Sequence, residues 1–299
     1  MSFIIEVPKA EQSKGRILIT GPSGFGKTTS AVLLAAGMAD VTGEDILLVD
    51  TEEGSGKLRS VIELAEYQYG RISAPFHPSK YIEALQAAED NGFGIVILDS
   101  ITHEWGGSGG ILDMADKEGE RVKNQFQKWV RPKREHKRFL EAILQSKCHV
   151  ICTARSKTDK TQTDNKGDRM AAKFGLMPVQ ESDLEYEFTV AFDIYADSHT
   201  CAASKDRTSL FDQKDFIISR DTGRELAEWL CSGAKPRETD KDWGARMMKQ
   251  AEEKGLSVDD LRFIVKARGF ESSSGLTDEQ RAMVEEDLEQ AEPAKEGDE

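Results

Sequence analysis

Short apolar runs alternate with longer segments of mixed polarity along most of this chain, and the alternation predicts strands and helices in turn. The first four runs are almost continuous in isoleucine, leucine and valine, which is typical of strands buried on both faces of a parallel sheet. Two later runs are joined by a short turn, which favours an antiparallel pair. The predicted strands cover residues 16–20, 45–50, 94–99 and 149–154, followed by the later pair at 188–196 and 199–204.

The segments between these strands have the length of helices. They are predicted at 27–39, 57–69, 79–91 and 120–146, with a break expected at Pro132. Alternating strands and helices imply an α/β domain with a mainly parallel twisted sheet and helices on both faces.

After residue 233 the pattern changes to helices alone, predicted at 241–254, 257–268 and 277–290. We therefore predict two domains: a core over residues 1–233, and a small helical extension over residues 234–299 that ends in an acidic tail.

Composition narrows the class of protein. With 299 residues and 38% hydrophobic content, the chain can hold one large domain and a small appendage. No run reaches the roughly 18 apolar residues of a membrane span, the first residues do not resemble a signal peptide, and the four cysteines form no C-x-x-C pair. These features predict a cytoplasmic protein with no membrane partner. The net charge of −14 argues against DNA binding through bulk charge, although residues 121–138 and 155–173 are rich in lysine and arginine.

The clearest chemical signal follows the first strand. The segment GPSGFGKT, which starts at Gly21, matches the phosphate-binding loop G-x-x-x-x-G-K-[ST] between an apolar strand and an alanine-rich helix. Backbone N–H groups and the helix N-terminus would hold nucleotide phosphates there. Lys27 would reach the β- and γ-phosphates, and the Thr28 hydroxyl would bind Mg²⁺. The predicted ATP-binding residues are Gly21, Pro22, Ser23, Gly24, Phe25, Gly26, Lys27, Thr28 and Thr29.

Asp99 ends another apolar strand, and the carboxyl ends of parallel strands meet at the ligand edge of the sheet. Beside the phosphate loop, its carboxylate is predicted to hold Mg²⁺ opposite Thr28. Hydrolysis also needs a group that orients the attacking water. Ser100 stands where a glutamate would indicate one broad class of ATPase, which leaves Glu52 and Glu104 as the candidates.

The order of these motifs resembles that of the RecA-like recombinases, in which a D-x-E element at a neighbouring strand end carries the catalytic glutamate. Asp50-Thr51-Glu52 matches that element, so the resemblance favours Glu52, with Glu53 second. Glu104 remains a competitor, for which a solvated loop residue is the alternative interpretation. Where those proteins place a polar sensor residue, this chain offers Thr153 and Arg155.

Lys205-Asp206-Arg207 is similar to the K-x-R element by which RecA-like and KaiC-like ATPases insert positive charge into the site of the neighbouring subunit. The resemblance therefore implies catalytic roles for Lys205 and Arg207 in a homo-oligomer with sites between subunits. An ordinary solvated hairpin is the alternative interpretation.

The segments GPSGFGKTT, DSITHEWGGSGGILD, KFGLMPVQ, EYEFTVAFDIYAD and KDR together resemble phage-encoded RecA-like ATPases of the Sak single-strand annealing group, over about residues 14–230. The resemblance implies a RecA-like P-loop core and an ATPase of phage recombination. It further implies action in the cytoplasm of an infected bacterial host, with a single-strand binding protein as partner.

RecA-like folds turn two loops toward DNA, and these correspond to residues 102–120 and 156–177 here. Flexible cations beside an aromatic residue suit single-stranded DNA, whose phosphates attract charge and whose bases stack. A second group of cations surrounds Trp129, where a solvated helix face is an equal interpretation. The candidate DNA-binding residues of the 156–177 segment are Lys157, Lys160, Lys166, Arg169, Lys173 and Phe174.

The leading hypothesis is a DNA-stimulated ATPase that binds single-stranded DNA and promotes annealing or strand exchange. The alternatives are an ATP-gated DNA- or protein-binding module with vestigial hydrolysis, and a hexameric RecA-type helicase. A small-molecule kinase is disfavoured, because the sequence has no recognisable arginine-rich substrate lid.

Overall fold

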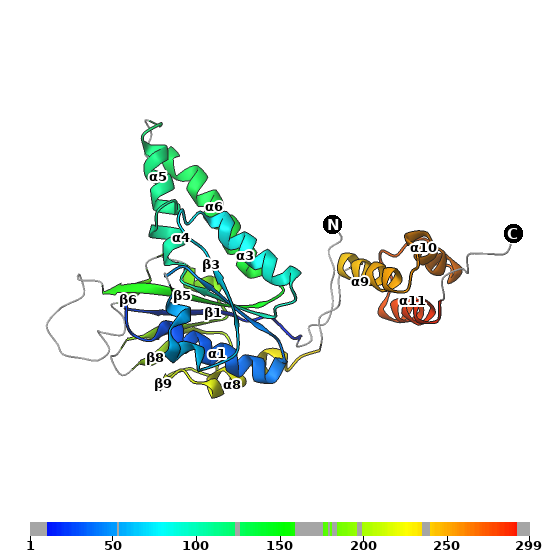
Figure 1. Cartoon of the computed structure of the whole chain (residues 1–299), viewed down its shortest axis with the longest axis horizontal. Helices are drawn as coiled ribbons and strands as arrows, with labels where there is room; N and C mark the ends of the chain where they lie inside the picture. Colours follow the sequence, from blue (N-terminus) through cyan, green and yellow to red (C-terminus); the bar gives the residue numbers. More distant parts are fainter. Residues whose placement is uncertain are drawn as a thin grey trace. The chain divides into compact units, whose positions relative to one another are not determined.

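The structure is a computed structural model that describes residues 11–52, 54–122, 126–158, 176–178, 180, 184–195, 199–234 and 240–291 (Figure 1). The chain divides into two compact units, Met1–Ala234 and Lys235–Glu299. Each unit has hydrophobic clusters of its own.

A single sheet forms the centre of the first unit, and nine of its strands lie in the described residues (Figure 1). They are β1 (Arg16–Gly21), β2 (Ile46–Asp50), β3 (Gln68–Arg71), β4 (Ile95–Asp99), β5 (His149–Thr158), β6 (Leu176–Pro178), β7 (Val190–Ile194), β8 (Thr200–Asp206) and β9 (Asp215–Ile217). Their order is β3-β2-β4-β5-β1-β7-β8-β9, and β6 pairs with β5 outside this path. Strands β3 to β7 along that order are parallel, whereas β8, β9 and β6 pair antiparallel.

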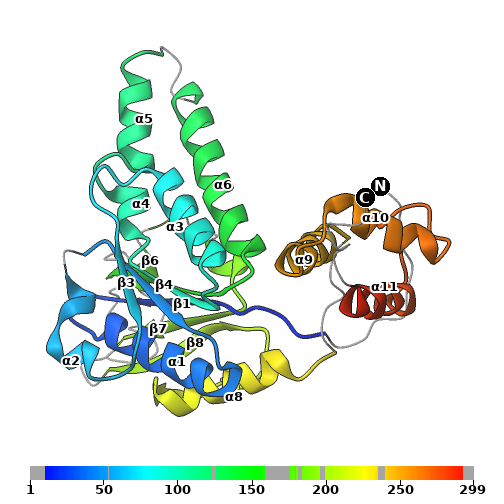
Figure 2. The same cartoon turned by 45° about the vertical axis from the view of Figure 1, so that its right-hand side comes forward.

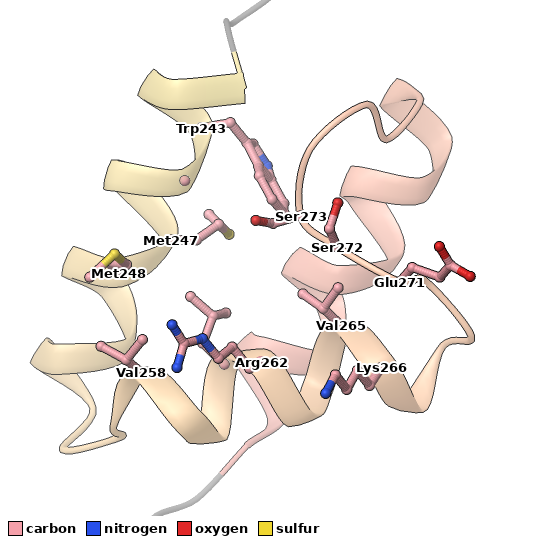
Figure 3. Close-up of a pocket in the computed structure, with 12 residues that line it drawn as sticks. Trp243, Met247, Met248, Val258, Arg262, Val265, Lys266, Glu271, Ser272 and Ser273 are labelled. Carbon is pink, nitrogen blue, oxygen red and sulfur yellow. The ribbon is translucent and has the colours of Figure 1, made fainter.

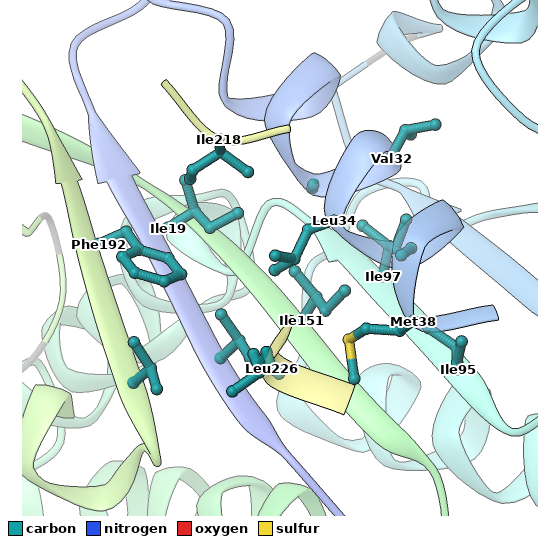
Figure 4. Packing of buried hydrophobic residues seen from close by; sticks show 14 of the residues in the cluster. Ile19, Val32, Leu34, Met38, Ile95, Ile97, Ile151, Phe192, Ile218 and Leu226 are labelled. Atoms are coloured by element: carbon teal, nitrogen blue, oxygen red, sulfur yellow. The ribbon is translucent and has the colours of Figure 1, made fainter. Parts of the chain in front are cut away.

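Helices cover both faces of the sheet (Figure 2). On one face, α1 (Lys27–Thr42) and α8 (Arg220–Cys231) bury apolar side chains against alternate residues of the strands, as the close view in Figure 4 shows for Ile19, Leu34 and Leu226. On the other face, α3 (Pro78–Asp90) and α6 (Val130–Gln145) pack against the intervening strand residues. The prediction of an α/β core with a mainly parallel sheet and helices on both faces is confirmed.

Two glycines allow α1 and α8 to approach closely. A Cβ atom on Gly37 would lie 1.8 Å from the Arg220 carbonyl oxygen, and one on Gly223 would lie 2.1 Å from the Leu34 carbonyl oxygen. Only residues without a side chain fit at this contact, which fixes the helix that begins with the phosphate loop against its neighbour.

Two predicted helices are wrong in extent. Residues 57–69 form only the end of a 3₁₀ turn, η1 (Ser55–Lys57), and the short α2 (Arg59–Ile62), before the chain enters β3. Pairing of β3 with β2 at the sheet edge overrides the local helical pattern. The helix predicted over 120–146 begins at Val130, after a 3₁₀ turn, η2 (Gln127–Trp129). Pro132 lies in its first turn, where a missing N–H group breaks no helical hydrogen bond.

The expectation of an open loop over 102–120 is also wrong. The chain forms α4 (Thr102–Gly106) and α5 (Ile111–Gly119) there. Figures 1 and 2 show α5 and α6 side by side, projecting together from the sheet. Thus the connection from β4 to β5 is a helical arm.

The second unit contains α9 (Asp240–Glu253), α10 (Val258–Ala267) and α11 (Asp278–Gln290), as the pattern predicts. Ser257 and Thr277 form capping boxes at the starts of α10 and α11, which satisfy N–H groups in the first turn. Trp243 is buried in the small core, and beside it lies a mainly apolar pocket of about 240 Å³ that α9 and α10 line (Figure 3). Across the described part of the chain, no helix is both long enough and apolar enough to cross a membrane.

Candidate nucleotide-binding site

The phosphate loop connects β1 to α1. Gly24 and Gly26 have φ angles of 84° and 82°, in the left-handed region that glycine adopts without steric cost. Gly26 is also the N-cap of α1, so the first N–H groups of the helix are directed toward the loop. His199 lies against this turn, with Nδ1 3.0 Å from the Phe25 carbonyl oxygen. The loop therefore has the backbone shape and the helix terminus that bind phosphate.

Lys27 reaches back across this loop. Its side chain is buried, and Nζ donates a hydrogen bond to the Pro22 carbonyl oxygen at 2.9 Å. Burial lowers the pKa of the Lys27 ammonium, while the negative charges of Glu52 and Asp99 oppose that shift. The three groups are thus within electrostatic range of one another at the carboxyl edge of the sheet.

Asp99 is buried at the end of β4 and is held by three hydroxyl groups. Thr28 Oγ1 and Ser55 Oγ donate to Oδ2 at 2.7 and 2.8 Å, and Thr153 Oγ1 donates to Oδ1 at 2.5 Å. Burial raises the pKa of the Asp99 carboxyl, and these hydrogen bonds act in the opposite direction. Carboxylate and hydroxyl oxygens suit Mg²⁺, so Asp99 and Thr28 fit this ion, with the Ser55 hydroxyl beside them. Ser55 was not among the predicted site residues.

A second buried carboxylate, Asp50, fixes the segment that follows β2. We call residues 51–57 the glutamate loop. Asp50 Oδ1 accepts from the Glu52 N–H at 2.6 Å, and Oδ2 accepts from the N–H groups of Gly54 and Gly56 at 3.0 and 3.2 Å. Oδ2 also accepts from the Tyr69 hydroxyl at 3.0 Å. Asp50, predicted only as the first residue of D-x-E, is therefore the anchor of the loop that carries Glu52.

Glu52 lies next to the phosphate loop, and its side chain is 20% exposed. Oε1 accepts from Ser100 Oγ and from Arg155 Nε, both at 2.9 Å. Burial tends to raise the pKa of this carboxyl, but the hydrogen bonds from Arg155 and Ser100 and the charges of Arg155 and Lys27 hold it below its usual value. Glu52 is thus an ionised hydrogen-bond acceptor close to Lys27, which is what orienting a water molecule requires. Glu53 lies outside the described residues.

Glu104 has a different environment, and its description as a solvated loop residue is wrong. It lies on α4 with a fully buried side chain. Its carboxylate is 3.1 Å from His136 Nδ1, and Gln180 Nε2 donates to it at 3.3 Å. The rings of Trp105 and His136 also pack edge to face, with centroids 5.1 Å apart. Glu104 therefore joins α4 to α6 inside the arm, in a polar group that no local sequence pattern marks.

Thr51 connects the glutamate loop to α4. Its hydroxyl donates to the Ser100 carbonyl oxygen and accepts from the Ser100 N–H, both at 2.9 Å, and it lies 3.0 Å from His103 Nδ1. The His103 ring stacks on Phe76, with centroids 4.7 Å apart. Ser100 and His103, which follow Asp99, therefore hold Thr51 of the glutamate loop in place. His103 belongs to α4, which is little more than one turn of helix.

The sheet order brings β5 between the phosphate-loop strand and the Asp99 strand. In register, Thr153 pairs with Asp99 on one side, and Arg155 pairs with Gly21 on the other. Both candidate sensor residues therefore lie between the phosphate loop and Asp99. Strand order is not written in the sequence, which is why their contacts could not be predicted.

Lys205 and Arg207 lie away from the phosphate loop of their own chain. Strand β8 is antiparallel to β7, so its last residue lies opposite Val190, which pairs with Ile17 at the start of β1. Lys205 Nζ and Arg207 Nη2 both donate to the Tyr186 carbonyl oxygen, the latter at 3.0 Å. The two cations therefore lie near the end of β1 opposite to the phosphate loop of their own chain.

Most of the candidate DNA-binding residues, namely Lys160, Lys166, Arg169, Lys173 and Phe174, lie outside the described residues. Lys157 belongs to β5, and its backbone pairs with Met177 of β6. On the arm, Arg131 pairs with Glu118 at 3.1 Å and Arg138 with Glu135 at 3.0 Å, so part of the cationic surface of α6 is neutralised within the arm.

A glycine-shaped phosphate loop, a buried lysine and an aspartate–hydroxyl cluster at the carboxyl edge of a parallel sheet define a P-loop nucleotide-binding domain. The family model of the AAA domain matches residues 13–222, and the chain belongs to this family of P-loop ATPases. One similar solved structure is a KaiC-like protein from the hyperthermophilic archaeon Pyrococcus horikoshii, with 14% identity and a TM-score of 0.40 over 70% of this chain and 94% of that one. No curated relative matches the sequence.

Proposed function

We propose that this P-loop ATPase uses Mg²⁺ to hydrolyse ATP and acts on single-stranded DNA in phage recombination, by annealing or strand exchange. The observation that carries the hydrolytic part is the glutamate loop, which Asp50 holds so that Glu52 and Ser55 lie beside the phosphate loop and Asp99. An ionised carboxylate held at this point supports hydrolysis, because it can orient a water molecule.

The residues divide the work between binding and reaction. The phosphate-loop N–H groups and Lys27 bind the phosphates, while Thr28 and Asp99 would hold Mg²⁺, which neutralises phosphate charge when bound. Glu52 orients the attacking water by accepting its hydrogen bond. Lys205 and Arg207 act on the site of the next subunit in a homo-oligomer, where they stabilise charge that develops on the transferred phosphoryl group.

The DNA part of the proposal rests on the resemblance to RecA-like annealing proteins and on the lysine- and arginine-rich sequence between β5 and β6. A single-strand binding protein is the partner that this resemblance implies. Cations of the 156–177 segment would contact phosphates, and Phe174 would stack on a base.

ATPase measurements with and without single-stranded DNA test the proposal. The wild type should hydrolyse ATP faster with DNA at low salt, and Lys27→Ala should abolish turnover. Glu52→Gln should reduce kcat at least about 100-fold while ATP still binds, because it removes the group that orients water. Glu63→Gln, the same change on an exposed glutamate directly after α2, serves as the control. The DNA function would be refuted if the protein does not bind single-stranded DNA and its ATPase rate is the same with and without DNA.

One observation favours a second candidate, an ATP-gated binding module with vestigial hydrolysis. Both Ser100 and Arg155 already bind the Glu52 carboxylate, which leaves less of it to hold a water molecule. Such a module would show little turnover for Glu52→Gln to remove. A hexameric helicase would share the same core, and a duplex-unwinding assay distinguishes it.

A further inference from the structure

The imidazole ring of His103 is fixed at two places beside the glutamate loop. Its Nδ1 atom lies 3.0 Å from the hydroxyl of Thr51, the residue before Glu52. One face of the ring stacks on Phe76, with an interplanar angle of 20°. The Phe76 N–H in turn donates to the Ser108 carbonyl oxygen at 2.7 Å. These contacts set the position and the tilt of the ring, and therefore the direction of its second nitrogen, Nε2.

The hydrogen bonds of Thr51 identify the nitrogen of His103 that carries the hydrogen. The Thr51 hydroxyl has a single hydrogen, and the Ser100 carbonyl oxygen, 2.9 Å away, can only accept it. The other two partners of the hydroxyl oxygen, the Ser100 N–H and His103 Nδ1, must therefore donate. We assign the ring hydrogen to Nδ1 on this ground. In a neutral ring, Nε2 is then an acceptor with a free lone pair.

Nε2 of His103 is a neutral acceptor that is open to solvent. Burial and the charge of Arg155 lower the pKa of the ring below its ordinary value of about 6.5, so the ring is neutral at pH 7. The negative charges of Glu52, Asp99 and Asp50 oppose that shift without reversing it. The ring is half-buried, and Nε2 is not one of the buried polar atoms without a partner. Within the described residues no group forms a hydrogen bond with Nε2, so its lone pair can accept from a water molecule.

Hydrolysis calls for such an acceptor, because Glu52 is a weak base. Burial tends to raise the pKa of its carboxyl, but the hydrogen bonds from Arg155 and Ser100 hold it below the usual value. The carboxylate can therefore orient a water molecule, but it has little tendency to take a proton from it. An imidazole is ordinarily the stronger base, with a reference pKa of about 6.5 against about 4.3 for a glutamate.

We propose that His103 is a catalytic residue of this ATPase, the general base that takes a proton from the attacking water through Nε2. This inference rests on the proposed function, because it adds a base to the same hydrolytic site. As the water oxygen bonds to the γ-phosphorus, one water hydrogen passes to Nε2. The bond from that phosphorus to the bridging oxygen breaks, and its electron pair stays on ADP. The imidazolium then releases the proton to solvent, while Nδ1 donates to Thr51 throughout.

The variant His103→Asn separates the two nitrogens of the ring. The asparagine amide can donate to Thr51 from the position of Nδ1, but it offers nothing at the position of Nε2. We expect kcat to fall about 100-fold, the lower end of the usual range for general-base catalysis, while Kd for ATP stays within about twofold. His77→Asn is the matched control. His77 caps α3 by accepting from the Ser79 N–H, which asparagine also does, so kcat should not change.

The pH dependence of kcat is a readout that a structural role would not move. The base acts only as the neutral ring, so wild-type activity is present above the pKa of His103 and is lost as the pH falls through it. In His103→Asn the remaining activity depends on Glu52, whose pKa is held below the usual value of a glutamate. The acid limb should therefore move to lower pH. If His103→Asn does not fold, His103→Gln carries the same test, because its longer amide can still pack on Phe76 and is no base.

The outcomes separate this inference from the proposed function. A kcat for His103→Asn within about threefold of the wild type overturns the proposal, because the ring would then only hold Thr51. A fall in kcat with weakened ATP binding, or with an unmoved acid limb, also overturns it, because His103 would then act in binding or in structure. A wild type with no Lys27-dependent ATPase activity instead overturns the proposed function.

Discussion

Replacing Asp50 by asparagine should loosen the glutamate loop while the phosphate loop stays intact. The buried carboxylate accepts four hydrogen bonds, from three backbone N–H groups and the Tyr69 hydroxyl. An asparagine offers only one oxygen. If that oxygen takes the Oδ2 position, the amide NH₂ faces the Glu52 N–H, where Oδ1 now accepts at 2.6 Å. If it takes the other position, the NH₂ faces three donors instead.

The first orientation of the amide costs less free energy, so it sets the size of the expected destabilisation. One charge-assisted hydrogen bond is lost, at about 1.5–3 kcal/mol, and three others become neutral and weaker. Removal of a fully buried charge offsets part of this loss. We therefore expect the free energy of unfolding of the core to fall by about 2–4 kcal/mol, which corresponds to a decrease in Tm of about 5–15 °C for a unit of this size. Because Glu52 is one of the released residues, kcat should fall at least about tenfold while ATP affinity changes little.

Calorimetry and steady-state ATPase assays on Asp50→Asn measure both effects. Tyr69→Phe is the matched control, because it removes one donor and leaves Asp50 charged and bonded to the loop. It should cost no more than about 1 kcal/mol and leave kcat within about twofold. The reasoning is refuted if Asp50→Asn has the same Tm and kcat as the wild type. It is also refuted if Tyr69→Phe lowers Tm and kcat as much as Asp50→Asn does.

Two further predictions concern packing and pH. Gly223→Ala should lower the Tm of the core, because its Cβ would lie 2.1 Å from the Leu34 carbonyl oxygen. Gly244→Ala is the control, since this glycine lies on α9 with open space around it, and it should not lower that Tm. An unchanged Tm for Gly223→Ala would contradict the close contact of α1 and α8. The pKa of the Glu52 carboxyl is held below its usual value largely by Arg155, and the group must be ionised to act. The acid limb of kcat should therefore move to higher pH in Arg155→Gln than in the wild type, and a pH–rate profile with an unmoved limb would show that another group sets it.

The features that the sequence predicts well are those encoded in consecutive residues. The phosphate loop needs glycines at fixed spacing before a helix, and Asp99 stands at the end of a strand that its continuous apolar run reveals. The three C-terminal helices carry their own capping signals at Ser257 and Thr277. Local physics decides each of these features.

The contacts that complete the site depend on which distant strands become neighbours. Asp50 and Tyr69 meet because β3 pairs with β2, although the residues before Tyr69 have a helical pattern. Arg155 reaches Glu52 because β5 lies between β1 and β4. Helix α8 covers α1 through Gly223, a residue that by itself predicts only a poor helix. In each case the contact depends on tertiary pairing that the local sequence does not specify.

In the proposed mechanism, the order of the strands also separates the residues that bind nucleotide from those that act in its hydrolysis. Lys27 and the phosphate loop belong to β1 and α1, and α8 fixes α1 through the glycine contact. Two groups on β5 act instead on the two carboxylates, since Thr153 donates to Asp99 and Arg155 donates to Glu52. A movement of the end of β5 would therefore change both carboxylates together and leave the phosphate loop in place. Substitutions on β5 should accordingly alter kcat more than ATP affinity.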